Sequence, residues 1–143
     1  MKTHHTLRPL PRIKGYRWNV EPARDWPHAG SLWYAYLLTS EERRIANLTV
    51  ILYDDRMVLR HLFVHHVYRG EGLGSKMLRS LLVTYPDIPI RLKIEPDKDD
   101  MPLDAEQLTA WYSRSGFVTE PEAPWMVRPG VARAADADQR KAK

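Results

Sequence analysis

The hydrophobic pattern of the chain changes abruptly at a run of three glycines, and this change limits the folds open to it. Before the run, residues 57–65 are rich in the aliphatic and aromatic residues typical of a β-strand. The run itself, Gly70-Glu71-Gly72-Leu73-Gly74, allows a sharp turn. After it, apolar residues recur at the spacing of one helix face, at Leu73, Met77, Leu78, Leu81 and Leu82. The pattern predicts a strand, a glycine turn and a helix that ends before Pro86.

Strand patterns precede this unit. Residues 31–39 and 46–53 are aromatic and β-branched, and a possible first strand covers 16–20. Only the polar residues 54–56 separate the strand at 46–53 from the strand at 57–65, which predicts an antiparallel hairpin. Residues 40–44 are charged and predict a loop or bend between the preceding strands.

A second helix and three short strands are predicted downstream. Residues 90–94 alternate apolar and basic side chains, as a strand does. The helix begins at Asp104, which can cap it together with Gln107, while Leu103 and Leu108 form a hydrophobic staple, and Gly116 ends it. Residues 117–119 and 125–128 are two closing strands. The predicted fold class is therefore α+β, or mixed α/β.

Composition narrows the class of protein. The 143 residues have room for one domain, and they include no cysteine, which excludes a disulfide framework and a thiol nucleophile. No apolar run is long enough for a membrane helix, and the first residues lack the apolar stretch of a secretory signal. We therefore expect a soluble, cytoplasmic protein.

The net charge of +4 is unevenly distributed. Residues 1–17 contain five basic residues and no acidic residue, residues 129–143 are also net basic, and the segment between them is net negative. Because the basic charge lies at the ends, a nucleic-acid partner is possible but not favoured. We expect a flexible basic arm over 1–14, one domain over 15–128 and a disordered tail over 129–143.

The glycine turn has the features of a phosphate site. Free N–H groups at a helix start, together with the positive end of the helix dipole, favour a phosphate or pyrophosphate. Arg69, Lys76 and Arg79 add positive charge nearby. A Walker loop would need Gly-Lys-Ser or Gly-Lys-Thr, whereas the order here is Gly74-Ser75-Lys76. The glycine spacing also differs from a dinucleotide-binding fingerprint.

Two motifs together carry a family resemblance. The first is Arg-x-x-Gly-x-Gly at Arg69, Gly72 and Gly74, after a strand that ends with Leu62-Phe63-Val64. The second is Tyr-x-x-x-Gly-Phe, from Tyr112 to Phe117. In this order, with a strand between them, they resemble the GNAT superfamily of N-acetyltransferases over residues 57–128. The resemblance implies the acyl-CoA N-acyltransferase fold, acetyl-CoA as co-substrate and an amine acceptor.

The resemblance also implies roles for individual residues. Cofactor binding is expected at eight positions, which are Leu62, Val64, Arg69, Gly70, Gly72, Leu73, Gly74 and Ser75. Tyr112 is the expected general acid for the departing thiolate. The base that deprotonates the amine is either Glu95 or His61, and we rank Glu95 first. Direct attack in a ternary complex needs no covalent intermediate.

Several alternatives stay open on the sequence alone. His61 and His65 share a strand face, but no carboxylate or cysteine completes a ligand set, so we expect no metal site. The chain could instead be a GNAT-like binding module that has lost catalysis, or an acyltransferase that acts on a nucleic-acid base. A monomer and a homodimer are equally compatible with the sequence.

The acceptor side departs from the family pattern. Only a short, proline-containing segment over 21–30 separates the first two predicted strands, where family members usually place two helices. The acceptor side is therefore expected to be open, which suits a macromolecular substrate. The acidic stretch 95–106 is either solvated surface or a region that attracts a cationic amine.

Overall fold

The computed structural model describes residues 6–95, 104–122 and 124–130, which form two compact units divided between Tyr85 and Pro86. Within this described part, the chain contains seven β-strands, two α-helices and one short 3₁₀ helix. Each unit is α+β, so the predicted fold class is confirmed. Neither of these helices is long and apolar enough to cross a membrane.

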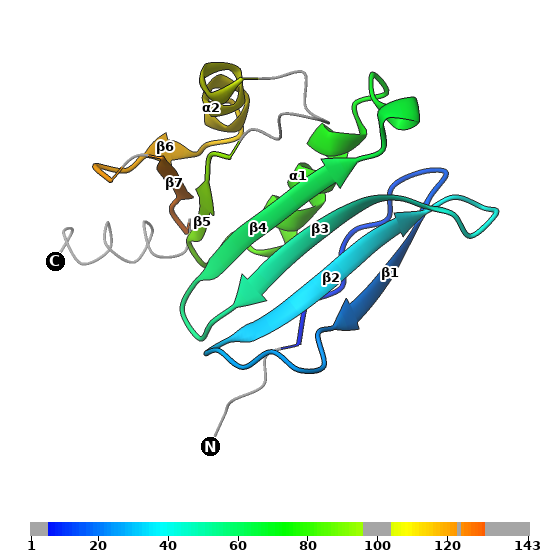
Figure 1. Cartoon of the computed structure of the whole chain (residues 1–143), viewed down its shortest axis with the longest axis horizontal. Coiled ribbons are helices and arrows are strands. Elements are labelled where there is room, and N and C mark those ends of the chain that lie inside the picture. The colour runs from blue at the N-terminus through cyan, green and yellow to red at the C-terminus, as the bar shows by residue number, and fades with distance from the viewer. Residues whose placement is uncertain (1–5, 96–103, 123, 131–143) are drawn as a thin grey trace, which may run out of the picture. The chain divides into compact units, whose positions relative to one another are not determined.

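The first unit is built on a four-stranded antiparallel sheet (Figure 1). Its strands are β1 (Arg17–Pro22), β2 (Ser31–Leu38), β3 (Arg44–Leu52) and β4 (Met57–Val64), which pair in chain order. The predicted hairpin between β3 and β4 is present, and its turn is closed by the Tyr53 N–H, which donates to the Arg56 carbonyl over 2.9 Å. The antiparallel meander places the end of β4 beside the start of β3.

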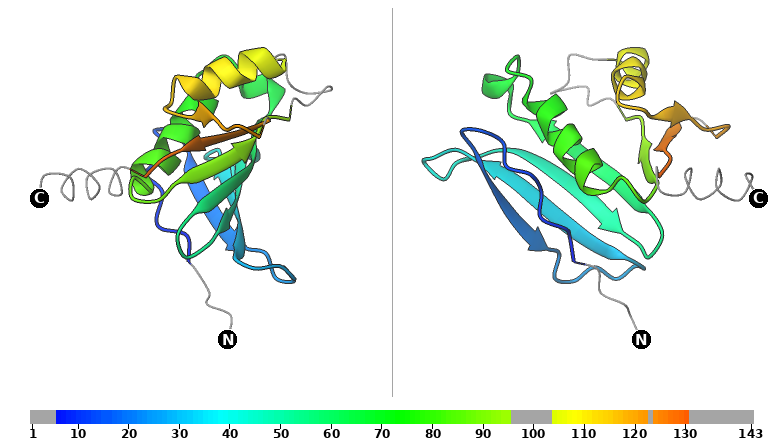
Figure 2. Two further views of the ribbon diagram at one scale, coloured as in Figure 1. Left: turned by 90° about the vertical axis from the view of Figure 1, so that its left-hand side faces the viewer. Right: turned by 180° about the vertical axis from the view of Figure 1, so that it is seen from behind.

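Helix α1 (Leu73–Thr84) covers one face of this sheet (Figure 2). Its apolar stripe is buried at Leu73, Met77, Leu78 and Leu81, as the helical spacing predicts. Sheet residues such as Leu37, Leu48 and Val50 are almost completely buried. The resulting core fixes the helix axis, and therefore the position of the α1 N-terminus, relative to β4.

The segment that precedes β1 also packs on α1, which corrects part of the expected flexible arm. Leu7 and Ile13 are buried. The Arg8 backbone N–H donates to the Tyr85 hydroxyl over 2.7 Å, and the Ser80 hydroxyl donates to the Pro11 carbonyl over 3.3 Å. Figure 2 shows this segment running alongside the helix. Residues 7–14 are therefore an ordered N-terminal strap, held by the buried side chains of Leu7 and Ile13 and by these two hydrogen bonds.

The second unit contains β5 (Ile90–Lys93), α2 (Ala105–Ser113), β6 (Val118–Thr119) and β7 (Trp125–Arg128). Strand β7 pairs antiparallel with both β5 and β6. Its core includes Phe117 and Met126, which are almost completely buried. The guanidinium of Arg91, on β5, donates to both carboxylate oxygens of Glu120, just after β6, over 2.7 and 3.0 Å.

The predicted capping box of α2 is confirmed. The Asp104 carboxylate accepts from the Gln107 N–H over 2.8 Å, and the Gln107 side chain accepts from the Asp104 N–H over 3.0 Å. The predicted contact of Leu103 lies outside the described residues, as do most of the acidic stretch 95–106 and the tail after residue 130.

Candidate functional site

The glycine turn has the backbone geometry of an anion site. The 3₁₀ helix η1 (His66–Tyr68) follows β4, and the turn then leads into α1. Gly70 and Gly72 adopt φ angles of +92° and +73°, which only glycine adopts without strain. A Cβ atom at either position would meet no atom within 4 Å. The two glycines therefore leave open space beside the backbone, which is what a close-approaching ligand requires.

The first turn of α1 presents donors at the same place. Gly72 is the N-cap, and the first helical bond joins the Lys76 N–H to the Gly72 carbonyl over 3.1 Å. The N–H groups of residues 73–75 therefore precede the hydrogen-bonded ladder and need other partners. The Gly72 cap has no side chain to offer them. Leu73 is buried, so this residue can offer a ligand only its backbone.

Arg69 braces the turn from the strand side. Its Nε donates to the Val64 carbonyl over 2.9 Å, and its guanidinium lies 5.9 Å from the centre of the Phe63 ring. The terminal nitrogen Nη2 of Arg69 is buried and has no hydrogen-bond partner among the described residues. The side chain thus folds back onto β4 rather than extending to solvent. Its structural contribution is to hold the end of β4 and the turn together, with a positive charge between them.

Strand β4 contains an irregularity just before the predicted site residues. Thr49 of β3 pairs with His61, while Val50 pairs with Leu59, so Arg60 is left out of this ladder. Such bulges bend a strand and are common beside active sites. His61, one candidate base, is exposed immediately after the bulge, and Leu62 and Val64 are half-buried further along the strand. Nothing in the sequence indicates the bulge.

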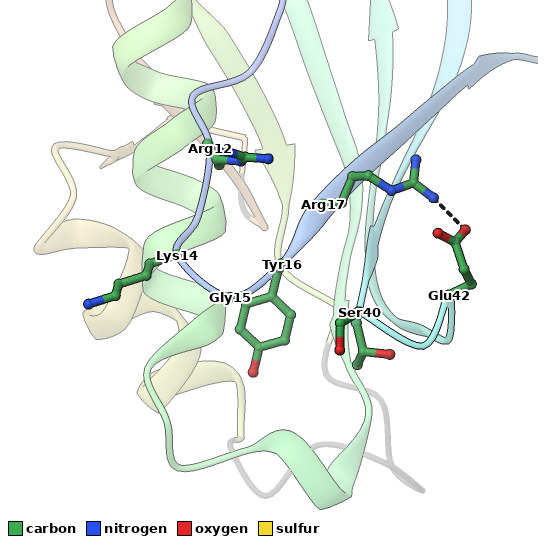
Figure 3. A pocket seen from close by; sticks show the side chains of 8 residues that line it. Arg12, Lys14, Gly15, Tyr16, Arg17, Ser40 and Glu42 are labelled. Carbon is green, nitrogen blue, oxygen red and sulfur yellow. Dashed lines mark hydrogen bonds and ion pairs between the residues drawn. The ribbon is translucent and has the colours of Figure 1, made fainter.

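A basic cavity of about 430 Å³ lies where the N-terminal strap meets β1 (Figure 3). It is lined by Arg12, Lys14, Tyr16, Arg17 and the turn between β2 and β3. Arg17 forms an ion pair with Glu42, and Figure 3 shows Lys14 extending away from both arginines. The excess of positive charge makes this cavity a poor site for a cationic amine.

In the second unit, the Tyr-x-x-x-Gly-Phe pattern forms the end of α2. The Phe117 N–H donates to the Tyr112 carbonyl over 3.3 Å, and the Gly116 N–H donates to the Ser113 carbonyl over 3.1 Å. Gly116 has a φ of +97°. These bonds define a Schellman motif, which favours glycine at this position. The motif returns the chain beneath the helix, so that the Tyr112 and Phe117 rings meet edge to face at 5.5 Å.

Tyr112 is half-buried in an apolar setting. Its ring also contacts the Trp111 ring edge to face at 4.8 Å. Burial raises the pKa of the Tyr112 hydroxyl from 10.0 to about 12, because the phenolate would lose hydration there. The hydroxyl therefore keeps its proton throughout the neutral range and can act as a hydrogen-bond donor.

This raised pKa predicts a loss of stability at alkaline pH. The unfolded chain releases the Tyr112 proton near pH 10, whereas the folded chain releases it near pH 12. The contribution of neutral Tyr112 to the free energy of unfolding is therefore complete below pH 10. It is lost as the pH rises to 12, which lowers the free energy of unfolding by roughly 2–3 kcal/mol. Urea unfolding of wild type and Tyr112→Phe from about pH 9 to about pH 12 measures this difference. Parallel loss of stability in the two proteins would contradict the prediction.

Glu95, the other candidate base, lies just after β5 and is exposed, with its side chain 3.1 Å from the Lys93 ammonium. Among the residues described by the structure, no group of histidines and carboxylates is arranged to hold a metal ion. The eight predicted cofactor residues all belong to the first unit, from β4 to the first turn of α1. Tyr112 and Glu95 belong to the second unit.

Solved structures with the same fold were found, although no protein-family model and no curated protein matches the sequence. A protein described as a GNAT-family acetyltransferase from Bacteroides thetaiotaomicron is 18% identical, with a TM-score of 0.54 over 78% of this chain and 69% of that one. A protein described as an acyl-CoA N-acyltransferase from Klebsiella pneumoniae is 15% identical, with a TM-score of 0.51 over 69% of this chain and 72% of that one.

Naa50 from Arabidopsis thaliana, in complex with the bisubstrate analogue CoA-Ac-MVNAL, is 18% identical, with a TM-score of 0.50 over 66% and 70% of the two chains. At identities this low, the structural similarity shows the fold alone. This chain therefore has the acyl-CoA N-acyltransferase fold of the GNAT proteins, as the two sequence motifs implied.

Proposed function

We propose that this protein is an N-acyltransferase that moves an acetyl group from acetyl-CoA to a primary amine. The observation that carries the proposal is the open glycine turn, where Gly70 and Gly72 leave room beside the free N–H groups of α1. A pyrophosphate is the ligand chemistry that such a helix start favours. The fold shared with GNAT proteins supports the same ligand.

The first unit would hold the co-substrate. The N–H groups of residues 70–75 donate to the pyrophosphate, and the exposed Lys76 and Arg79 add long-range attraction. Arg69 acts by fixing the turn, since its Nε donates to the Val64 carbonyl. The half-buried Leu62 and Val64 lie on β4 just before the turn, where they would line the path of the pantetheine arm.

The chemistry needs a base and a group that stabilises the leaving sulfur. Acetyl-CoA supplies a thioester, whose carbonyl carbon forms a bond to the amine nitrogen as the carbon–sulfur bond breaks and the electron pair leaves with sulfur. Glu95 or His61 takes the proton that the amine must lose before attack. We assign Tyr112 to the leaving thiolate, following the family resemblance, because its raised pKa keeps its hydroxyl protonated at every physiological pH.

The acceptor is proposed to be a protein lysine, a protein N-terminus or a small cationic amine. The bisubstrate analogue bound by Naa50 joins CoA to a peptide, which favours a peptide acceptor for the fold. Only residues 23–30 separate β1 from β2, so no helix pair lies between these described strands. This short connection agrees with an open acceptor side. The acidic residues Asp97, Asp99 and Asp100 would attract a cation, but they lie outside the described residues.

Two measurements test the proposal. Isothermal titration with CoA asks whether the protein binds the co-substrate at all. Mass spectrometry of reactions containing acetyl-CoA and either polyamines, peptides, a protein extract or nucleic acid then identifies the product. A gain of one acetyl group on an amine supports the proposal. Binding of CoA without any product would indicate a binding module, and acetylation of a base would indicate the nucleic-acid alternative.

A further inference from the structure

An acidic residue occupies the middle of the glycine turn. Glu71 lies between Gly70 and Gly72 and is exposed. A carboxylate free to face the N–H groups of α1 would compete for them and would repel a pyrophosphate. The same turn would therefore attract its ligand through the backbone and repel it through this side chain, unless the carboxylate is held elsewhere.

A tyrosine distant in the sequence holds this carboxylate. The Tyr16 hydroxyl donates to Oε2 of Glu71 over 3.1 Å, across 55 residues of sequence. Figure 3 shows the Tyr16 ring pointing from the end of the N-terminal strap toward the loop between β4 and α1. The hydrogen bond joins two segments at the protein surface, so it exists because the strap brings Tyr16 to this place.

The placement of Tyr16 is fixed on both sides. The Tyr16 N–H donates to the carbonyl of Ile13 over 3.0 Å, and Ile13 is buried. Gly15 allows this tight turn with a φ of +89°. Strand β1 begins at the next residue, Arg17, which pairs with Leu38. The backbone of Tyr16 is thus fixed between the buried end of the strap and the sheet.

We propose that Tyr16 is a positioning residue of the cofactor site, which holds the Glu71 carboxylate aside so that a pyrophosphate can reach the N–H groups of α1. The inference rests on the proposed function, and it assigns to the N-terminal strap a part in binding CoA. Partial burial and the bond to Glu71 raise the pKa of Tyr16, so its hydroxyl stays a donor at neutral pH.

A double-mutant cycle on CoA affinity tests this role. Tyr16→Phe releases the carboxylate, and we expect the Kd for CoA to rise about 5- to 10-fold at about 50 mM salt, the scale of one hydrogen bond and one nearby charge. Glu71→Gln removes the charge and is expected to bind CoA at least as tightly as wild type. In the Glu71→Gln background, Tyr16→Phe should have no effect. The rise in Kd caused by Tyr16→Phe should also be smaller at about 1 M salt, because salt screens the repulsion between Glu71 and the pyrophosphate.

Controls separate this role from a merely structural one. Tyr53→Phe removes a hydroxyl in the β3–β4 turn, at the opposite end of β4, and should leave the Kd unchanged. A Tyr16→Phe protein that binds CoA like wild type overturns the inference and leaves the proposed function intact. An equal loss in the Glu71→Gln background also overturns it, because Tyr16 would then act by packing alone. A wild-type protein that fails to bind CoA overturns both.

Discussion

Replacing Gly72 by glutamate should abolish CoA binding, with a rise in Kd of at least about 100-fold. Two effects act together at this position. The new side chain fills the space that is open beside the backbone, where no atom now lies within 4 Å of a Cβ. Its carboxylate also lies at the N-cap of α1, next to the N–H groups proposed to hold the pyrophosphate, and repels that group. Isothermal titration with CoA measures the loss.

The matched control is Gly72→Ala. Alanine suffers the same backbone strain at a φ of +73°, of about 1–2 kcal/mol, but adds no charge and little bulk. Its Kd should rise much less than that of Gly72→Glu, while the two proteins should melt at similar temperatures. If Gly72→Glu bound CoA with wild-type affinity, the assignment of the cofactor site to this turn would be wrong.

The sequence is most informative where one local pattern determines the structure. The glycine turn, the helix after it and the capping box of α2 are all predictable, because each depends on residues a few positions apart. Asp104 and Gln107 satisfy each other's backbone groups without help from the rest of the chain. The Tyr112–Phe117 pattern is likewise local, since Gly116 forms the Schellman turn that brings the two rings together.

The N-terminal strap is not predictable in this way, because its structure depends on distant partners. Its many basic residues and prolines indicate a flexible arm. Leu7, Leu10 and Ile13 are its aliphatic residues, and so few apolar positions do not predict that the segment packs on α1. The contact between Tyr16 and Glu71 joins positions 55 residues apart, so no periodicity or motif could show it. The bulge at Arg60 is equally unpredictable from the sequence, because it arises from the pairing of β3 with β4.

Arg69 illustrates how a sequence motif can leave the role of a residue open. The residue type and spacing place a cation directly before the glycine turn. The sequence does not show that the guanidinium turns back to the Val64 carbonyl. Because its Nε is bonded to the strand, we propose that Arg69 shapes the turn and that the backbone N–H groups bind the phosphate directly.

Tyr112→Phe should lower kcat by about 10- to 1000-fold with the acceptor found by mass spectrometry, while the Kd for CoA stays unchanged. The substitution removes only the hydroxyl and keeps the ring that packs on Trp111 and Phe117. Without that donor, the departing sulfur loses its hydrogen bond in the transition state. If Tyr112→Phe kept the wild-type kcat, Tyr112 would be a packed aromatic residue with no catalytic role.

The pH dependence of this loss tests whether the Tyr112 hydroxyl acts in its protonated form. Because burial raises the pKa of Tyr112 to about 12, its charge does not change between about pH 7 and pH 10. The ratio of wild-type to Tyr112→Phe turnover should therefore be constant over this range, while each rate follows the titration of the base and the amine. Trp111→Phe serves as the packing control, since it alters the ring contact and removes no hydroxyl. A ratio that falls toward one near pH 10 would mean that the hydroxyl ionises there, and Tyr112 would then be too exposed for the assigned role.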